Sequence, residues 1–280
     1  MRDSFPIGRI FGIQIRVHFL FPLILGFVLL QASSEADTSW PDAAFLSAMV
    51  LMLFGVVLLH ELGHSLVAQA FGIQVLDITF WPLGGMARMS EIPESPRVEG
   101  QVAIAGPLVN LALAALGLLL LVLLGGWGEG MGTSIAHIME SPTAFLTAFV
   151  AMNLMLGIFN LVPAFPMDGG RILRAYLARN REWVRATELA VHIGRFFAFA
   201  MMLAGSYSCI LALIGVWVWW MGARELWYVR MKHKARTAYE ETGYPGSQTG
   251  GATEGFSLDD LHKLEAFRGT MKKYREHDDT

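Results

Sequence analysis

Two histidines and a glutamate within five residues are the strongest chemical signal in the chain. In His60-Glu61-Leu62-Gly63-His64 the imidazoles are four residues apart, so on a helix they project from one face and could share a Zn²⁺ ion. Glu61 would then lie close enough to take a proton from a coordinated water. The pentapeptide also occurs by chance, and the alternative is a satisfied polar cluster or one face of a proton path. The spacing favours the metal site.

The composition indicates that this motif lies in a membrane. Hydrophobic side chains make up 54% of the 280 residues and charged ones only 16%, against about 25% charged in soluble domains. The single cysteine excludes a disulfide framework and a cysteine-rich metal site, so a metal would be bound by His, Asp or Glu. No basic block large enough for a nucleic-acid partner is present. Because His and Glu are costly inside an apolar helix, their presence there indicates function.

Stretches without acidic or basic residues predict an all-α polytopic membrane protein with about six transmembrane helices. The predicted spans are residues 17–32, 43–70, 100–124, 142–161, 186–205 and 207–222. Lysines and arginines gather on alternate loops only, and of the 21 basic residues only Arg195 falls inside a span. By the positive-inside rule, both termini are therefore expected in the cytoplasm.

Two segments are not expected to cross the bilayer. Residues 73–90 are rich in β-branched and aromatic side chains and contain Pro82 and the turn signal Gly84-Gly85, which predicts a small membrane-associated β-hairpin on the cytoplasmic side. Residues 229–280 are expected to form a cytoplasmic polar tail, in which a Gly/Ser/Thr linker precedes a short amphipathic helix starting near Ser257. Residues 1–228 would then form one membrane domain.

A zinc site of this kind needs a third protein ligand and leaves a fourth position for water. The helical rise places His60 roughly 25 Å from the outer face, near the cytoplasmic side, which excludes the acids of the outer loops. Asp77, Glu91 and Glu94 are possible ligands, but Asp168 is better placed, directly after the fourth span. Two prolines and two glycines around it forbid a regular helix, and irregular backbone at membrane depth is typical of a cavity lining. Asp168 could also be the N-cap of the next helix, a role that does not exclude ligation.

Together these motifs resemble the site-2 protease family of intramembrane zinc metalloproteases, in its compact prokaryotic form. The resemblance covers about residues 7–228. It rests on His-Glu-x-x-His at residues 60–64 and on Asn-x-x-Pro-x-x-Pro-x-Asp-Gly at residues 160–169. Further matches are residues 11–18, Pro82-Leu-Gly-Gly85 and Ala105-Gly-Pro-Leu-Val-Asn110.

The resemblance implies one Zn²⁺ per chain, bound by His60, His64 and Asp168, with Glu61 as the general base. It also implies hydrolysis of a peptide bond in or near the transmembrane segment of a single-span membrane protein, as in regulated intramembrane proteolysis. The lipid bilayer would be that of a bacterial or archaeal cell, the inner membrane where there are two. No insertion of PDZ size separates the spans, and the residues after the sixth span are too few for paired CBS domains, so regulation by such modules is not expected.

Several roles stay open at this point. Asn160 could bind the substrate backbone or the developing oxyanion, or only satisfy free backbone groups of its own chain. The hairpin at residues 75–90 could accept an extended substrate strand at its edge, or serve as a structural cover. Two other functions are a metal or ion transporter, although no internal repeat of the histidine pair is present, and a catalytically silent membrane adaptor, although neither a ligand nor the base is missing.

Overall fold

The computed structural model describes residues 4–23, 26, 30, 40–81, 84–125, 142–206 and 208–242. Contacts divide the chain into two units, Met1–Leu226 and Trp227–Thr280. Every site discussed below lies in the first unit. The linker and the terminal amphipathic helix expected after Thr242 lie outside the described residues, so the proposed division into residues 1–228 and 229–280 stays a prediction.

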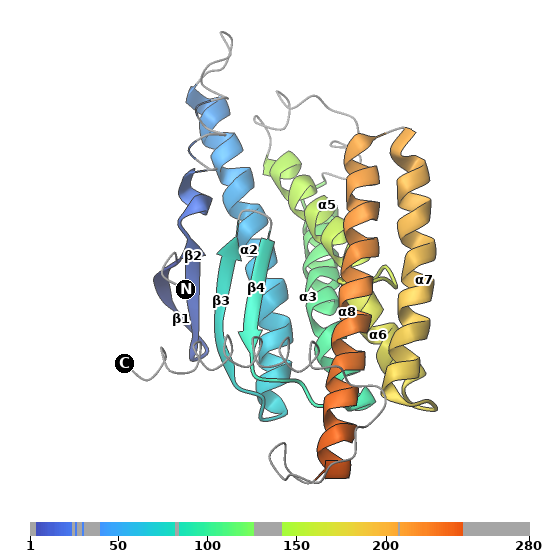
Figure 1. Cartoon of the computed structure of the whole chain (residues 1–280). Helices are drawn as coiled ribbons and strands as arrows, with labels where there is room; N and C mark the ends of the chain where they lie inside the picture. The colour runs from blue at the N-terminus through green and yellow to red at the C-terminus, as the bar shows by residue number, and fades with distance from the viewer. Residues whose placement is uncertain are drawn as a thin grey trace. The chain divides into compact units, whose positions relative to one another are not determined.

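Long helices make up most of the described chain (Figure 1). They are α2 (Trp40–Ala70), α3 (Pro96–Leu123), α5 (Pro142–Asn160), α7 (Trp183–Leu203) and α8 (Cys209–Thr242). Within the described residues, five helical segments are long and apolar enough to cross a membrane: Ser47–Ala70, Pro96–Leu123, Thr143–Asn160, Trp183–Leu203 and Cys209–Ala238. They coincide with the second to sixth predicted spans. Two shorter elements follow α5 and α7, the helix α6 (Asp168–Leu177) and the 3₁₀ turn η1 (Ala204–Ser206).

The first and last predicted spans need correction at their ends. Residues 17 and 18 belong to a β-strand, so the first span cannot begin at residue 17, and only part of the predicted segment, including helical residues 20–23, is described. At the other end, α8 continues past Gly222 to Thr242. Residues 223–242 contain no glycine or proline and are rich in strong helix formers, which explains why the helix continues where the hydrophobicity ends.

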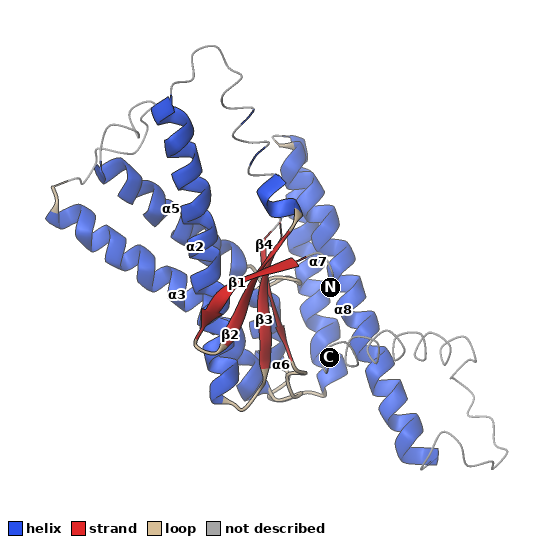
Figure 2. Ribbon diagram, turned by 90° about the vertical axis from the view of Figure 1, so that its left-hand side faces the viewer, coloured by secondary structure: helices blue, strands red, loops and turns tan. Residues whose placement is uncertain are grey.

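The strands form one four-stranded sheet rather than the single hairpin expected from the sequence (Figure 2). Its order is β1 (Ser4–Ile10), β2 (Ile13–His18), β3 (Val75–Trp81) and β4 (Gly84–Met89). The pairs β1–β2 and β3–β4 are antiparallel, and β2–β3 is parallel. Gly84 pairs with Trp81 and Gly85 with Phe80, so these glycines begin strand β4 and are not the turn expected from the sequence. Residues 82 and 83 lie outside the described residues.

The first hairpin was missed although its pattern is present in the sequence. Apolar residues alternate at Ile13, Ile15 and Val17, as they do in a half-buried strand. The turn before them has positive φ angles at Phe11 (52°) and Gly12 (80°), a geometry that glycine adopts without steric cost. The strand is short and runs directly into apolar residues, so the hydrophobicity of the following segment concealed it.

The sheet packs on α2 and so covers the helix that contains the histidine motif. Leu62 of α2 is buried in one cluster with Ile13, Ile15, Ile78 and Phe80 of the strands. On another side α2 packs against α3, where a Cβ at position 63 would meet the Ala105 carbonyl oxygen at 3.0 Å. Close approach at small residues is typical of helices packed in a membrane. The residues around the motif are therefore fixed by the sheet and by α3.

Candidate metal centre

The two histidines of the motif face each other within one buried cluster. His60 and His64 lie one turn apart on α2, are 4% and 5% exposed, and have their Nε2 atoms 3.1 Å apart. The helix periodicity accounts for this, because residues at i and i+4 project from the same face. The expected convergence of the two imidazoles is present in the structure.

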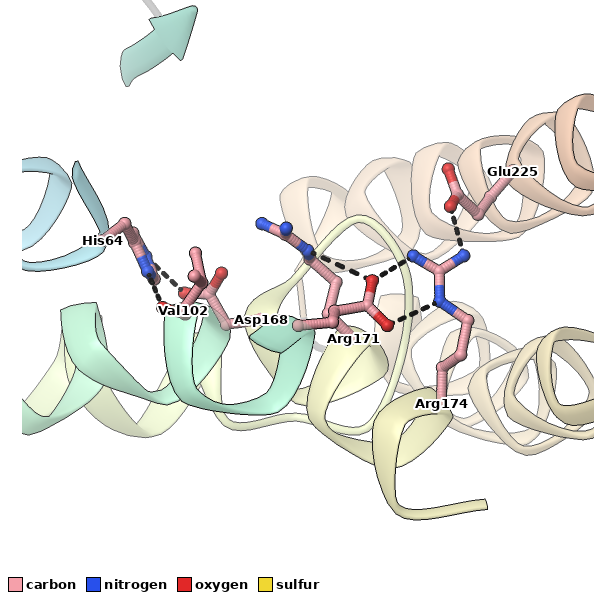
Figure 3. Close-up of polar contacts among 7 residues, drawn as sticks. His64, Val102, Asp168, Arg171, Arg174 and Glu225 are labelled. Carbon is pink, nitrogen blue, oxygen red and sulfur yellow. Dashed lines mark hydrogen bonds and ion pairs between the residues drawn. The ribbon is translucent and has the colours of Figure 1, made fainter. Parts of the chain in front are cut away.

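Asp168 joins this pair from a distant part of the chain. Its Oδ2 atom lies 3.2 Å from His60 Nε2, and the side chain is buried. The same oxygen lies 3.1 Å from His64 Nε2 (Figure 3). In the described part of the chain, these three residues form the only set of His, Cys, Asp or Glu side chains placed to share a metal ion. Asp77, one of the alternative ligands, is instead bound by Arg88 and Thr79.

The segment that presents Asp168 is irregular up to Met167 and helical from Asp168 onward. The irregular backbone expected here is present up to Met167, but Gly169 and Gly170 do not contribute to it, since they lie in the first turn of α6. A Cβ at position 169 would collide with the carbonyl oxygens of Leu161 and Val162, so glycine is needed for close packing of the preceding loop. The N-cap position is occupied by Met167, and Asp168 is not the cap.

A backbone carbonyl on α3 orients His64. The Nδ1 atom of His64 lies 2.7 Å from the carbonyl oxygen of Val102, which can only accept a hydrogen bond. The proton of a neutral imidazole is then on Nδ1, and the lone pair of Nε2 is directed toward Asp168. When His64 is neutral, this nitrogen and the Asp168 oxygen are two electron-rich atoms 3.1 Å apart, whereas a protonated His64 donates a hydrogen bond to Asp168. Such an arrangement needs a shared cation or proton, and the donor set suits zinc.

Gly106 of α3 forms the wall behind the imidazoles. A Cβ at this position would overlap the His64 ring and would lie 2.8 Å from Cε1 of His60. Only a residue without a side chain lets α3 approach the histidines this closely. The sequence analysis gave no role to Val102 or Gly106. The adjacent Gly106-Pro107 pair inside an otherwise apolar helix was the signal available for the second of them.

Asp168 is ionised in this environment. Burial by itself raises the pKa of its carboxyl group, but the hydrogen bonds and charges of His60 and His64 outweigh burial and lower the pKa to about 2. At neutral pH the centre therefore contains a carboxylate beside two imidazoles. This is a suitable donor set for a divalent metal ion.

Glu61 lies between α2 and the last strand of the sheet. A Cβ at Gly85 of β4 would meet Glu61 Cγ at 3.0 Å, and the backbone of Ala87 hydrogen-bonds to the Glu61 carboxylate. The N–H group of Ala87 is the donor, because a carboxylate only accepts. The candidate base is thus next to both the histidine pair and β4.

Asn160 is the last residue of α5 and is partly buried. Its Nδ2 atom donates a hydrogen bond to the carbonyl oxygen of Leu156 at 3.0 Å, one turn back in the same helix. This contact turns the side chain back onto the backbone of its own helix, in line with the alternative role considered for Asn160. A substrate-binding role for this residue remains a prediction.

Comparison with known proteins identifies the family of this chain. The model of peptidase family M50 matches residues 48–203, a range that includes both histidines, the glutamate and Asp168. The chain belongs to peptidase family M50. The resemblance to site-2 proteases is thereby confirmed. The predicted class of a polytopic helical membrane protein is confirmed as well, although the sheet has four strands where a two-stranded hairpin was expected.

Individual M50 relatives come from archaea and bacteria. The chain is similar to "Zinc metalloprotease MJ0392" of Methanocaldococcus jannaschii, with 35% identity over 227 residues, which are 80% of this chain and 61% of the relative. It is also similar to "Putative zinc metalloprotease Rip3" of Mycobacterium tuberculosis, with 32% identity over 239 residues, 82% of this chain and 57% of the relative. The chain thus spans about three fifths of the length of these curated relatives.

A solved structure of the family matches most of the chain. The "Site-2 Protease from Methanocaldococcus jannaschii" is 35% identical, and the match covers 80% of this chain and 95% of that one, with a TM-score of 0.53. This M50 chain is therefore an integral membrane protein with the site-2 protease fold.

Proposed function

We propose that the protein is a zinc-dependent intramembrane endopeptidase that hydrolyses a peptide bond in or near the transmembrane segment of a single-span membrane protein. The observation that carries the proposal is the convergence of His60, His64 and Asp168 beside Glu61, with the two histidines and Glu61 on a helix long enough to cross a bilayer. The printed names of the relatives, zinc metalloproteases and a site-2 protease, support the same reaction.

His60, His64 and Asp168 would bind the zinc ion through two imidazole nitrogens and one carboxylate oxygen. When bound, zinc supplies a Lewis acid that polarises the scissile carbonyl and makes a water molecule acidic enough to attack at neutral pH. Val102 keeps the Nδ1 proton of His64 in place, so that Nε2 remains free to act as a ligand. Asp168 contributes the negative charge that favours a cation at this depth.

Glu61 is the proposed general base and acid. Its carboxylate accepts a proton from the attacking water, and the new C–O bond forms as the carbonyl carbon becomes tetrahedral. Glu61 then delivers this proton to the leaving amine as the C–N bond breaks. The hydrogen bond from Ala87 to the carboxylate orients the side chain between α2 and β4.

The edge strand β4 is the proposed place where an unwound substrate lies. A substrate helix has its carbonyl groups in hydrogen bonds, so the segment must become extended before attack. Because β4 ends the sheet and contacts Glu61 at Gly85, an added strand would lie next to the base. A photoreactive residue at Met86 should crosslink a trapped substrate, whereas one at Met155 on α5 should not. Equal crosslinking at both positions would contradict this docking mode.

Both termini are proposed to lie in the cytoplasm, because lysines and arginines gather on alternate loops. The single native cysteine, Cys209, allows a direct test after its replacement by serine. In that background, Ser208→Cys is expected to react with a membrane-impermeant maleimide on intact cells. Asn180→Cys should react only after the cells are opened. The reverse pattern would invert the orientation.

Zinc content and peptide cleavage, measured on the same detergent-purified protein, test the proposed function. The wild type should bind about one zinc and cut a single-span reporter. Glu61→Gln should bind zinc but lose about 10²- to 10⁴-fold in cleavage rate, as is typical for removal of a general base. Glu94→Gln, an exposed glutamate, is the matched control and should behave like the wild type.

Two outcomes would favour the other candidate functions. A folded wild-type protein that neither binds zinc nor cleaves would overturn the protease proposal and favour a membrane adaptor. Zinc flux across proteoliposomes without cleavage would instead favour a transporter. Full cleavage by Glu61→Gln would show that Glu61 is not the general base, without contradicting the proposed zinc ligands.

A further inference from the structure

A second buried charged cluster lies beside the metal centre and takes no part in the proposed reaction. It consists of Glu99 on α3, Arg171 and Arg174 on α6, and Glu225 on α8, and is called the Arg174 cluster below. Glu99 and Arg174 are only 3% and 6% exposed. Charged side chains this deeply buried are rare unless they are paired.

Arg174 is held on every side of its guanidinium group. Its Nε donates to Glu99 Oε2 at 3.0 Å and its Nη2 donates to Glu99 Oε1, which makes a two-pronged contact. Its Nη1 donates to Glu225 Oε1 at 2.5 Å (Figure 3). The guanidinium carbon also lies 4.9 Å from the ring centre of Phe165 and 5.1 Å from that of Trp183. A planar fork with this many contacts allows little displacement.

The charges of the cluster balance. Two carboxylates face two guanidinium groups, with Arg171 Nε lying 3.8 Å from Glu99 Oε1. Burial lowers the pKa of Arg174, but Glu99 and Glu225 raise it more, so the side chain stays charged. A well-packed apolar set of similar volume often stabilises a protein as much as a buried ion pair does. Stability alone therefore does not explain the presence of these charges.

The Arg174 cluster lies on the two helices that present Asp168 and orient His64. Arg174 lies on the same short helix as Asp168. Glu99 lies on α3, one turn before Val102, whose carbonyl group orients His64, and less than two turns before Gly106. The two helices touch at this point, where a Cβ on Gly100 would lie 3.3 Å from Ala175 Cβ. The Arg174–Glu99 contact thus joins the helix that presents Asp168 to the helix that orients His64.

A helix as short as α6 needs external contacts to keep its place. It has ten residues, which is too few for stability by itself in solution. Asp168 and His64 are 104 residues apart in the chain, so nothing local sets the distance between them. The contacts of α6 with its neighbours must therefore set it, and the forked Arg174–Glu99 contact is the most directional of these.

We propose that Arg174, bound by Glu99, is a positioning residue for the metal centre, which sets the place of Asp168 relative to the histidine pair and thereby the affinity for zinc. Arg174 itself touches neither the metal nor the substrate. The inference deepens the proposed function and rests on zinc binding at His60, His64 and Asp168.

The test is the zinc dissociation constant of purified full-length variants, measured by competition with a chromophoric chelator. Arg174→Lys keeps the charge but loses the planar fork, so a purely electrostatic or space-filling role would be largely preserved. We expect its affinity for zinc to fall about 10- to 100-fold, the range seen when partners outside the ligand shell are lost. The spectrum of the Co²⁺-substituted protein should change as well, because it responds to ligand geometry.

Arg88→Lys is the matched control. Arg88 forms an equally forked contact with buried Asp77, on the sheet and away from α6. Its replacement should lower the thermal unfolding midpoint but leave the zinc dissociation constant unchanged. A comparable loss of zinc affinity in both variants would show a general effect of destabilisation and would overturn the proposal.

A double variant separates positioning from folding. In Glu99→Leu/Arg174→Met, both partners of the pair become apolar, a change that often preserves stability. This protein should fold, with an unfolding midpoint near that of the wild type, yet bind zinc at least tenfold more weakly. Wild-type affinity in the folded double variant or in Arg174→Lys would overturn the positioning role alone. Absence of zinc from the wild type would overturn the proposed function together with this inference.

Discussion

The metal centre and the Arg174 cluster are both buried sets of charged or polar side chains, and the same helix, α6, contributes to each. In the Arg174 cluster each guanidinium group faces a carboxylate, so the charges cancel within the protein. In the metal centre an Asp168 oxygen faces two imidazole nitrogens, and in the described residues Asp168 has no lysine or arginine partner. His60 Nδ1 is also buried without a partner among the described residues.

This difference separates structural from functional polar groups. A buried group costs free energy unless it finds a partner, so a cluster that satisfies itself needs nothing from outside. A cluster in which electron-rich atoms converge is stable only with an added cation or proton. The ionised Asp168 carboxylate attracts a cation to this cluster. The chemistry is therefore expected at the unsatisfied cluster.

Removal of Asp168 is expected to have the largest effect. Asp168→Ala deletes the only carboxylate among the three ligands, so zinc affinity should fall by more than about 100-fold, beyond the loss typical of partners outside the ligand shell. Cleavage should disappear with the metal. Zinc content after dialysis and reporter cleavage measure both effects.

Asp77→Asn provides the control for that variant, because Asp77 is equally buried but is paired with Arg88. It should lower stability while one zinc per chain is retained. Full zinc occupancy in Asp168→Ala would remove this residue from the ligand set and break the contrast between the two clusters.

Gly106→Ala is expected to have an intermediate effect, centred on the histidines. The added methyl group would overlap the His64 ring and displace the imidazoles, so zinc affinity should fall about tenfold or more. Isothermal competition for zinc gives this value directly.

Gly117→Ala on the same helix is the matched substitution, since its methyl group would meet Val150 Cγ2 at 2.6 Å, away from the metal centre. Overpacking should lower the free energy of unfolding by about 1–3 kcal/mol, without changing zinc affinity. If both alanine variants bind zinc equally well, α3 does not shape the metal centre.

The smallest expected effect is a pH dependence of the zinc-free protein. The pKa of Asp168 is lowered to about 2, so its ionised form stabilises the fold above its ordinary pKa of about 3.9, and this contribution is lost as the pH falls through 2. The contribution is about 2–3 kcal/mol. Unfolding midpoints in chelator between pH 5 and pH 2 should fall more steeply for the wild type than for Asp168→Asn. Parallel curves would contradict the assigned pKa shift.

The sequence predicted the long helices and the chemistry of one motif because both depend on local patterns. Uncharged stretches of sufficient length predict helices that cross a membrane, and the i, i+4 spacing alone places His60 and His64 on one face. It also favoured Asp168 as their partner, from chain order and depth. The first hairpin was missed because its second strand runs directly into an apolar stretch. The parallel pairing of Ile13–His18 with Val75–Trp81 links segments far apart in the chain, so no local pattern predicts it.

What the sequence determined by itself was therefore the set of residue types that can bind zinc and the helices that place them in a membrane. Only the tertiary structure decided how closely those residues meet. The approach of α3 at Gly106, the carbonyl of Val102 on His64 and the forked contact of Arg174 with Glu99 all join residues that are distant in the chain. Such contacts depend on side-chain packing in three dimensions, which no local spacing encodes.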